Sequence, residues 1–303
     1  MALSQRDVRT RIKAVTNIEK ITRAMAMIAA ARLRRAVTRI ETLRPYANAI
    51  RRMTREASKA AGSLKRVPIL QAHDEERTVG LLLVAGDRGL AGAFNSNVVR
   101  AGIAAGHEHE AAGRRVVYFA SGRRVASSLA FRSLEVAESF TGYTDRPSFS
   151  DARRIAERLV AAFLDGEVDR VEIVYNGYVS AISQVVRRET LLPLQQATLL
   201  EEESAEDAAV EAAKPYHVAP EYEPDPEAVL RRLVPDYVEI SIFRALLEST
   251  ASEHGARMTA MRHASDNAVE LIQDLTLQMN RARQAEITQD LMEVVAGAEG
   301  LGG

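Results

Sequence analysis

Two long segments without helix-breaking residues lie at the two ends of this chain. Residues 4–44 contain neither glycine nor proline, and between residues 236 and 296 the only one is Gly255. Globular helices usually run for about 8–20 residues, so the sequence predicts two helices of unusual length. The first reaches about residue 59 if it continues through Pro45. The second would be roughly 90 Å long, which favours a rod that projects from whatever the middle of the chain forms.

Composition limits the kinds of site that the chain can form. The 303 residues include no cysteine, which excludes disulfides and zinc–thiolate sites. The longest apolar run, near Val79 to Ala85, is too short to cross a bilayer. The basic N-terminus lacks the continuous apolar core of a secretory signal. We therefore expect a soluble chain of one or two domains.

The charged residues are distributed unevenly. Residues 1–60 hold fifteen Lys and Arg but four Asp and Glu, whereas residues 201–227 hold ten acids, one lysine and four prolines. The acidic stretch is typical of an exposed loop, either merely solvated or engaged in a contact. For the basic helix we favour an acidic protein partner or nucleic acid, because such a charge density costs self-repulsion unless something offsets it.

The middle of the chain alternates strands with helices. The candidate elements are a buried strand at 78–85, a helix at 95–112, a strand at 116–120, a helix at 148–164 and strands at 170–175 and 182–192. This alternation implies βαβ units and a mostly parallel sheet. The predicted fold is α/β: a long antiparallel coiled coil of the N- and C-terminal helices with an inserted, mostly parallel, Rossmann-like domain. The predicted boundaries are 1–60 for the first helix, 77–194 for the α/β domain, 195–235 for an acidic, proline-rich connection and 236–303 for the last helix and tail.

The glycine-containing turn at residues 86–92 does not match a nucleotide-binding motif. Its glycines are three residues apart, whereas the dinucleotide fingerprint requires G-x-G-x-x-G. Asp87 would repel a phosphate, which Arg88 offsets only in part. No glycine is followed by lysine, so the chain lacks a P-loop. We favour a plain strand-to-helix turn over a nucleotide site.

Other catalytic patterns are missing as well. His107 and His109 are two residues apart on an expected helix, so they point to different faces and form a poor metal pair. A solvated surface is the favoured interpretation for them. The motifs G-x-S-x-G and H-E-x-x-H do not occur. We therefore expect no catalytic residue, no cofactor and no metal in this chain.

The two terminal helices carry apolar stripes that predict an antiparallel pair. In the first helix the stripe is Val8, Ile12, Val15, Ile18, Thr22, Met25, Ile28 and Ala29, resumed at Ile40, Leu43, Ala47 and Ile50. In the last helix it is Val238, Ile242 and Ala245, then the small or polar Ser252, Ala256, Thr259, His263 and Asp266, then Leu271, Leu275, Met279, Ala282, Ile287 and Leu291. Such a seam buries little apolar surface, so we expect much of the pair to depend on an enclosing partner.

Five motifs of this chain closely resemble the gamma subunit of F-type ATP synthases. They are ITRAMAMIAA at 21–30, GDRGL at 86–90, YEPDP at 222–226, SEHGARM at 252–258 and NRARQAEIT at 280–288. The resemblance is collinear over nearly the whole chain. It implies a non-catalytic rotor shaft whose paired helices sit inside a ring of three alpha and three beta subunits. The α/β domain would then be a foot, placed with the epsilon subunit on the membrane ring of c subunits.

The resemblance also implies residue roles and a location. Met25 matches the family position that faces an acidic loop of a beta subunit, and the basic cluster Arg32, Arg34 and Arg35 lies just beyond it. Arg283 and Gln284 match a pair that hydrogen-bonds a second beta loop, with Thr288 nearby. The turn and foot positions are Asp87, Arg88, Gly89, Tyr222 and Glu223, and the tail from Ala285 would lie in an apolar bearing. The implied protein is a single-copy subunit of a proton-translocating synthase, peripheral on the cytoplasmic face of a bacterial membrane.

Two alternative functions remain from the residues alone. A Rossmann-like nucleotide-binding enzyme with helical arms would need a phosphate-compatible glycine turn, which the sequence lacks. A basic coiled coil that binds nucleic acid would explain the charge of the first helix. Its aromatic residues for base stacking are nearly absent, however, because Tyr46 is the only one among residues 1–60.

Overall fold

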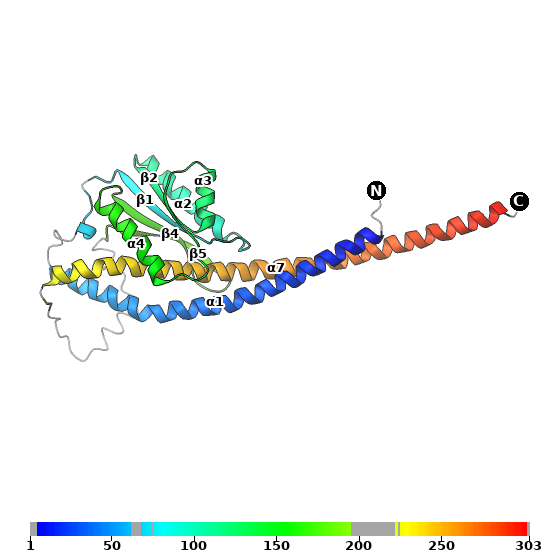
Figure 1. Ribbon diagram of the computed structural model, residues 1–303, viewed down its shortest axis with the longest axis horizontal. Helices are drawn as coiled ribbons and strands as arrows, with labels where there is room; N and C mark the ends of the chain where they lie inside the picture. Colours follow the sequence, from blue (N-terminus) through cyan, green and yellow to red (C-terminus); the bar gives the residue numbers. More distant parts are fainter. Residues whose placement is uncertain (1–4, 62–67, 74, 195–221, 224, 302–303) are drawn as a thin grey trace. The chain divides into compact units, whose positions relative to one another are not determined.

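The computed structural model describes residues 5–61, 68–73, 75–194, 222–223 and 225–301. The chain divides into two compact units, residues 31–256 on the one hand and residues 1–30 with 257–303 on the other. Two long helices pass through both units, α1 (Gln5–Ala61) and α7 (Pro226–Leu301) (Figure 1). Both predicted terminal helices are therefore present. Most of the predicted acidic loop, residues 201–221, lies outside the described residues.

Helix α7 begins at Pro226 and not, as the sequence predicted, at Asp236. Asp225 acts as its N-cap, because its carboxylate accepts a hydrogen bond of 2.8 Å from the amide of Ala228. Proline is favourable at the first helical position, where the amide that it lacks would be unpaired anyway. The predicted connection over 195–235 therefore extends too far by the first turns of a helix.

Both long helices contain a proline, Pro45 in α1 and Pro235 in α7. Each proline removes one hydrogen bond from its helix. Close to both positions, Ile50 of α1 packs with Leu233 and Ile240 of α7 in a buried cluster. This packing between the helices offsets the lost hydrogen bonds, so neither helix ends at its proline.

The larger unit contains a five-stranded sheet. Its strands are β1 (Thr78–Val84), β2 (Arg115–Ser121), β3 (Val136–Phe140), β4 (Arg170–Tyr178) and β5 (Gln184–Leu192). They lie in the order β3-β2-β1-β4-β5. Strands β1 to β4 all run parallel to one another, and β5 pairs with β4 in antiparallel fashion. The predicted mostly parallel sheet is confirmed.

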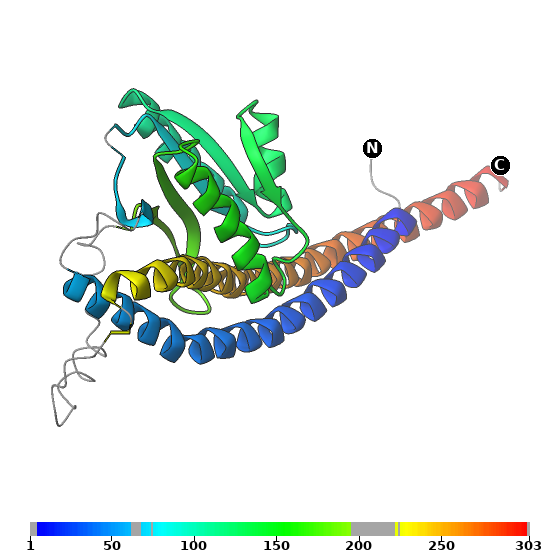
Figure 2. The same cartoon turned by 60° about the vertical axis from the view of Figure 1, so that its left-hand side comes forward.

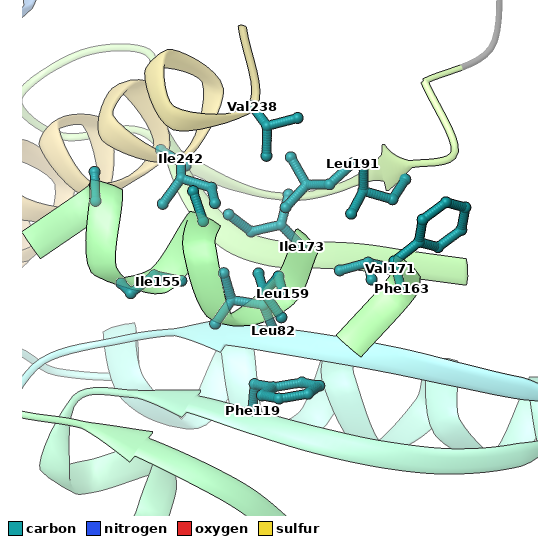
Figure 3. Packing of buried hydrophobic residues seen from close by; sticks show 14 of the residues in the cluster. Leu82, Phe119, Ile155, Leu159, Phe163, Val171, Ile173, Leu191, Val238 and Ile242 are labelled. Carbon is teal, nitrogen blue, oxygen red and sulfur yellow. The ribbon is translucent and has the colours of Figure 1, made fainter. Parts of the chain in front are cut away.

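Helices cover both faces of this sheet. On one face lie α2 (Phe94–Ala111) and α3 (Arg123–Phe131), and on the other lie α4 (Phe149–Leu164), the short 3-10 helix η1 (Pro68–Leu70) and the first part of α7 (Figure 1). Within β1, Leu81 and Leu83 pack toward α2 and α3, while Leu82 packs toward α4 and α7. Figure 3 shows this second core around Leu82 and Leu159. Because both faces are buried, β1 reads as one continuous apolar run.

The sequence failed to predict α3 and β3. Helix α3 is nine residues long and begins with two arginines, so its amphipathic period is brief. Strand β3 lies at the edge of the sheet, where alternate residues are exposed, and its sequence VAESF lacks an apolar run. Short elements at an edge carry little of the periodicity on which such predictions rest.

The smaller unit is an antiparallel pair of α1 and α7 segments that lie side by side (Figures 1 and 2). Its buried and half-buried positions alternate in steps of four and three, the heptad spacing of a coiled coil. On α1 they are Val8, Ile12, Val15, Glu19, Thr22, Ala26 and Ala29, and on α7 they are Met261, Ser265, Ala268, Ile272, Leu275, Met279 and Ala282.

This seam differs from the predicted one. Ile18 and Ile28 were placed in it but are 52% and 55% exposed. Leu271, His263 and Asp266 are exposed as well. A supercoil keeps a repeat of seven residues, so the seam continues through Glu19 and small residues while some isoleucines face outward. The prediction of a weak seam with small and polar members holds, but several of its members were wrong.

The last part of α7 has no neighbouring segment within the described residues. Every residue from Arg283 to Ala296 is exposed, including Ile287 and Leu291, which the sequence had placed in the seam. None of the helices in the described parts of the chain is both long enough and apolar enough to cross a membrane.

Candidate functional site: docking of helix α7 on the sheet

The order of the strands creates a crevice at one end of the sheet. Strand β1 lies between β2 and β4, so the chain leaves it toward one side and later returns on the other. In open parallel sheets, ligands bind outside the carboxyl ends of the strands at such a switch point. Here that end is formed by the turn that starts at Gly86, after β1, and by Asn176 near the end of β4.

Helix α7 occupies this crevice. Its residues 248–255 are all buried, although most of them are polar or charged. The Ser252 hydroxyl donates to the carbonyl of Asn176 at 3.1 Å. The Thr250 hydroxyl shares its hydrogen between the carbonyl of Thr144 at 2.9 Å and that of Leu246, in its own helix, at 2.8 Å. Asn176 in turn donates to the carbonyl of Phe94 at the start of α2. A helix that looks polar in sequence is thus held by the carboxyl ends of the strands.

Two glycines allow the helix to approach the sheet closely. A Cβ atom on Gly86 would lie 2.9 Å from the carboxylate of Glu253, which is 1% exposed. A Cβ atom on Gly255 would lie 2.9 Å from the carbonyl oxygen of Ala181. A cavity between α7 and the end of β1 has a volume of about 10 Å³, room for one water molecule at most. The position where this fold type binds a nucleotide is filled by the helix.

Asp87 fills a second position that a phosphate would take. Its carboxylate accepts four hydrogen bonds, from the amides of Arg123, Gly142 and Thr144 and from the Thr144 hydroxyl. Arg123 is the first residue of α3, and helix N-termini attract anions. The sequence predicted that Asp87 would repel a phosphate. The structure shows that its carboxylate itself occupies the anion position.

Arg88 and Arg32 meet on one carboxylate. The Arg88 and Arg32 guanidinium groups lie 3.0 Å and 3.1 Å from the same Asp145 oxygen. This links the turn after β1 to helix α1. Gly89 lies under the side chain of exposed Arg124. The structure therefore brings together three of the predicted positions, Arg32 on α1 and Asp87 and Arg88 in the turn.

A buried hydrogen bond between two hydroxyl groups holds the loop after β3 in place. The Tyr143 hydroxyl and the Ser121 hydroxyl are 2.7 Å apart and hydrogen-bonded. Burial raises the pKa of Tyr143 far above its ordinary value, although the hydrogen bond with Ser121 acts in the opposite direction. The tyrosine therefore stays neutral, and Thr144 and Asp145, which follow it, keep fixed places at the docking site.

A family model described as ATP synthase matches residues 4–301. The ATP synthase gamma chain of Rubrobacter xylanophilus is 41% identical, with 98% of each chain covered, and that of Moorella thermoacetica is 42% identical, again with 98% of each covered. This chain belongs to the ATP synthase gamma chain family. The expectation of a non-catalytic subunit is confirmed by this membership, and neither alternative function has support among these relatives.

Solved structures share the fold of this gamma chain. One is from Euglena gracilis mitochondrial ATP synthase, in an OSCP/F1/c-ring assembly, with a TM-score of 0.65 at 18% identity over 98% of this chain and 94% of that one. Another is from the central stalk and c ring of Tetrahymena thermophila mitochondrial ATP synthase, with a TM-score of 0.58 at 24% identity over 81% and 99%. These likenesses confirm the predicted fold class.

The remaining predicted positions of the gamma chain are spread over both units. Met25 is half-buried, while Arg34, Arg35, Arg283 and Gln284 are exposed. The exposed Thr288 donates its hydroxyl to the carbonyl of Gln284 at 2.8 Å, so that hydroxyl is already engaged within its own helix.

The two predicted positions before α7 differ from each other. Tyr222 is half-buried and packs against the core that α4 and α7 form with the sheet. Burial, together with the nearby Glu56 carboxylate, raises the pKa of Tyr222. Glu223 is exposed. Tyr222 thus helps to hold the start of α7 on the domain, whereas Glu223 is open to solvent.

The prediction for His109 was wrong. It is 5% exposed and lies between α2 and the sheet, with its Nε2 atom 2.8 Å from Arg188 and 3.3 Å from Glu172. His107 is exposed, as expected. A spacing of two does send the two histidines to different faces, but one of those faces is the inner one. No group of acidic or histidine side chains that could hold a metal occurs among the described residues.

Sequence reasoning also missed the residues that carry the docking. Ser252 and Glu253 lie in the motif at 252–258, and Thr250 precedes it. The sequence placed Ser252 in the seam between the two long helices, whereas its hydroxyl bonds the end of β4. The sequence shows here only a run of polar residues on a helix. Their burial becomes clear only when the helix is packed on the sheet.

Proposed function

We propose that this chain is the rotary central-stalk subunit of a proton-translocating F-type ATP synthase, transmitting torque between a membrane c ring and catalytic beta subunits. Its partners would be the alpha and beta subunits, the epsilon subunit and the c ring, with one copy per complex. The protein would be peripheral on the cytoplasmic face of the membrane. Residues 1–60 and 226–303 would serve as the shaft, 77–194 as the foot and 195–225 as their connection.

The docking of α7 carries this proposal. A foot that turns with a ring can drive a shaft only if the two cannot slip. Buried hydroxyls hold helix α7 at the ends of the strands, and two glycines let the backbones approach closely. The cavity between α7 and the end of β1 measures only about 10 Å³. Close-packed contacts of this kind transmit strain because they have low compressibility.

The shaft would act on each beta subunit like a ligand, presenting a different face at each rotation angle. A ligand shifts a conformational equilibrium only by its differential affinity for the conformations, so each face would favour a different conformation of the beta subunit. Met25 with Arg34 and Arg35 would face an acidic loop of beta, and Arg32 would share its charge between that loop and Asp145. Arg283 and Gln284, with Thr288 nearby, would bond a second loop. The exposure of Arg34, Arg35, Arg283 and Gln284 supports these roles.

Loosening the docking should uncouple the motor. We expect Thr250→Val combined with Ser252→Ala to remove the hydroxyl contacts of α7 with Thr144 and Asn176 while keeping the helix intact. In inverted membrane vesicles, ATP hydrolysis should persist while ATP-driven proton pumping falls at least about tenfold, as the loss of two buried hydrogen bonds would cause. Thr276→Val is the matched control, because that hydroxyl bonds only the carbonyl of Ile272 in its own helix.

The outcome separates two possibilities. Equal pumping by the double variant and by the Thr276→Val control would show that this junction does not carry torque. A synthase that assembles and pumps without this chain would overturn the proposed function as a whole.

A further inference from the structure

A second, basic groove lies beside the docking site. It is formed by α1, by the loop after β3 and by His254 of α7, and has a volume of about 650 Å³. Its wall contains Arg34, Arg35 and Arg39 of α1 together with Asp145 and Arg146 of the loop. All of these residues belong to the larger unit.

The positive charge of this groove is not balanced within the described residues. The Asp145 carboxylate is shared between Arg32 and Arg88. None of the described carboxylates lies within ion-pair distance of Arg34, Arg35, Arg39 or Arg146. Burial, and next the Arg146 guanidinium, lower the pKa of Arg39. Arginine nevertheless stays protonated, so the groove concentrates at least four positive charges.

The guanidinium groups also keep donors free for a ligand. Arg39 donates to the carbonyl of Pro147, and Arg35 donates through Nε to the carbonyl of Ala31. Each guanidinium has five N–H bonds, so these contacts use a minority of them. Planar forks of this kind match phosphate oxygens in a bidentate way.

We propose that this groove binds a soluble, multiply charged phosphate compound of the polyphosphate or nucleoside triphosphate class. The volume lies within the range of about 300–1,000 Å³ that is usual for small-ligand sites. A chain of phosphates can place several negative charges among the guanidinium groups at once, whereas a single carboxylate supplies one. The site is separate from the crevice at the sheet, which α7 fills, and the proposal does not rest on the shaft function.

Such a ligand would join three elements. It would contact α1 through Arg34, Arg35 and Arg39, the loop after β3 through Arg146, and α7 near His254. Because it binds the folded chain, it should also raise the melting temperature in proportion to the logarithm of its concentration. Any partner that uses Arg34 and Arg35 would compete with it.

Isothermal titration of the full-length chain with inorganic tripolyphosphate tests the proposal. We expect saturable binding that weakens at high salt, and a loss of affinity of at least about tenfold in Arg39→Gln combined with Arg146→Gln. Arg132→Gln is the matched control, because Arg132 is exposed and its guanidinium donates to the carbonyl of Ser128. It should bind like the unchanged protein.

A second variant keeps the test decisive if the first one folds poorly. Arg39→Lys with Arg146→Lys retains the charges but loses the planar forks, and should bind with intermediate affinity. The proposal is overturned if tripolyphosphate binds equally well to the folded double variants and the control. It is also overturned if a hexaglutamate peptide binds the unchanged chain as tightly as tripolyphosphate, since the groove would then be a surface for acidic protein segments.

Discussion

At the scale of single residues, the glycines of the turn at 86–92 have different roles. Gly86 lies against the buried Glu253 carboxylate, whereas Gly89 lies against the exposed end of the Arg124 side chain. A methyl group at Gly86 therefore forces a buried group to move, and one at Gly89 displaces a side chain that is free to turn into solvent. The same motif thus contains one glycine that the packing requires and one that it does not.

This difference predicts the effect of two matched substitutions. Gly86→Ala should lower the free energy of unfolding by about 1–3 kcal/mol, the usual cost of overpacking. Gly89→Ala should change it by less than about 0.5 kcal/mol, as surface substitutions do. Urea unfolding of the full-length chain measures both values. A similar loss in both variants would mean that the contact between α7 and the turn is looser than described.

At the scale of elements, buried charges hold helix α2 to the sheet. Glu172 on β4 accepts hydrogen bonds from Arg188 on β5 and from His109 on α2. Burial acts to raise the pKa of Glu172, but the hydrogen bonds from Arg188 and His109 outweigh it and hold the pKa below its ordinary value. The ionised carboxylate therefore stabilises the fold.

The sign of this shift predicts a pH dependence. A lowered pKa gives stability that is present above the ordinary pKa of about 4.5 and is lost as the pH falls through the lower folded value. Glu172→Gln should cost about 3 kcal/mol of unfolding free energy at pH 7, the cost of breaking a buried pair. The difference from the unchanged chain should shrink below about pH 4.5. Glu167→Gln, at an exposed pair with Arg158, should show neither effect in urea unfolding between pH 3 and 7.

How well the sequence predicted each element depended on how that element is buried in the fold. Strand β1 is buried on both faces, so its apolar run predicted it directly. The coiled-coil seam was harder, because the supercoil selects Glu19 and Thr22 for burial and leaves Ile18 outside. His109 could not be placed without knowing which face of α2 meets the sheet.

The docking site itself was not predictable by such rules. Its residues on α7 are polar, and in an isolated helix they would read as a solvated face. They are buried because they meet the carbonyls of Asn176, near the end of β4, and of Thr144, in the loop after β3, and both segments are distant from α7 in sequence. Contacts between segments that are distant in sequence leave no periodic pattern of apolar residues. The family resemblance of the motif at 252–258 marked this segment but gave no reason for its burial.

At the scale of the whole molecule, one stretch of helix α7 packs in the fold and another stretch of the same helix is open to solvent. Residues 245–255 of α7 are all buried, and the part from Arg283 to Ala296 is exposed throughout. Side chains in the exposed part contribute little to the fold of the isolated chain. If the chain is a shaft, they matter only inside the complex.

This division predicts how a double substitution should behave. Arg283→Ala with Gln284→Ala should leave the unfolding of the isolated chain within about 0.5 kcal/mol of the original, as is usual for exposed positions. In the assembled synthase it should lower the rate of ATP hydrolysis about tenfold, because it removes charge-assisted hydrogen bonds to a partner. Arg281→Ala, also exposed on α7, is the control and should leave the rate nearly unchanged. An equal loss from the control would mean that general charge, and not a specific pair of contacts, links this end of the helix to the catalytic subunits.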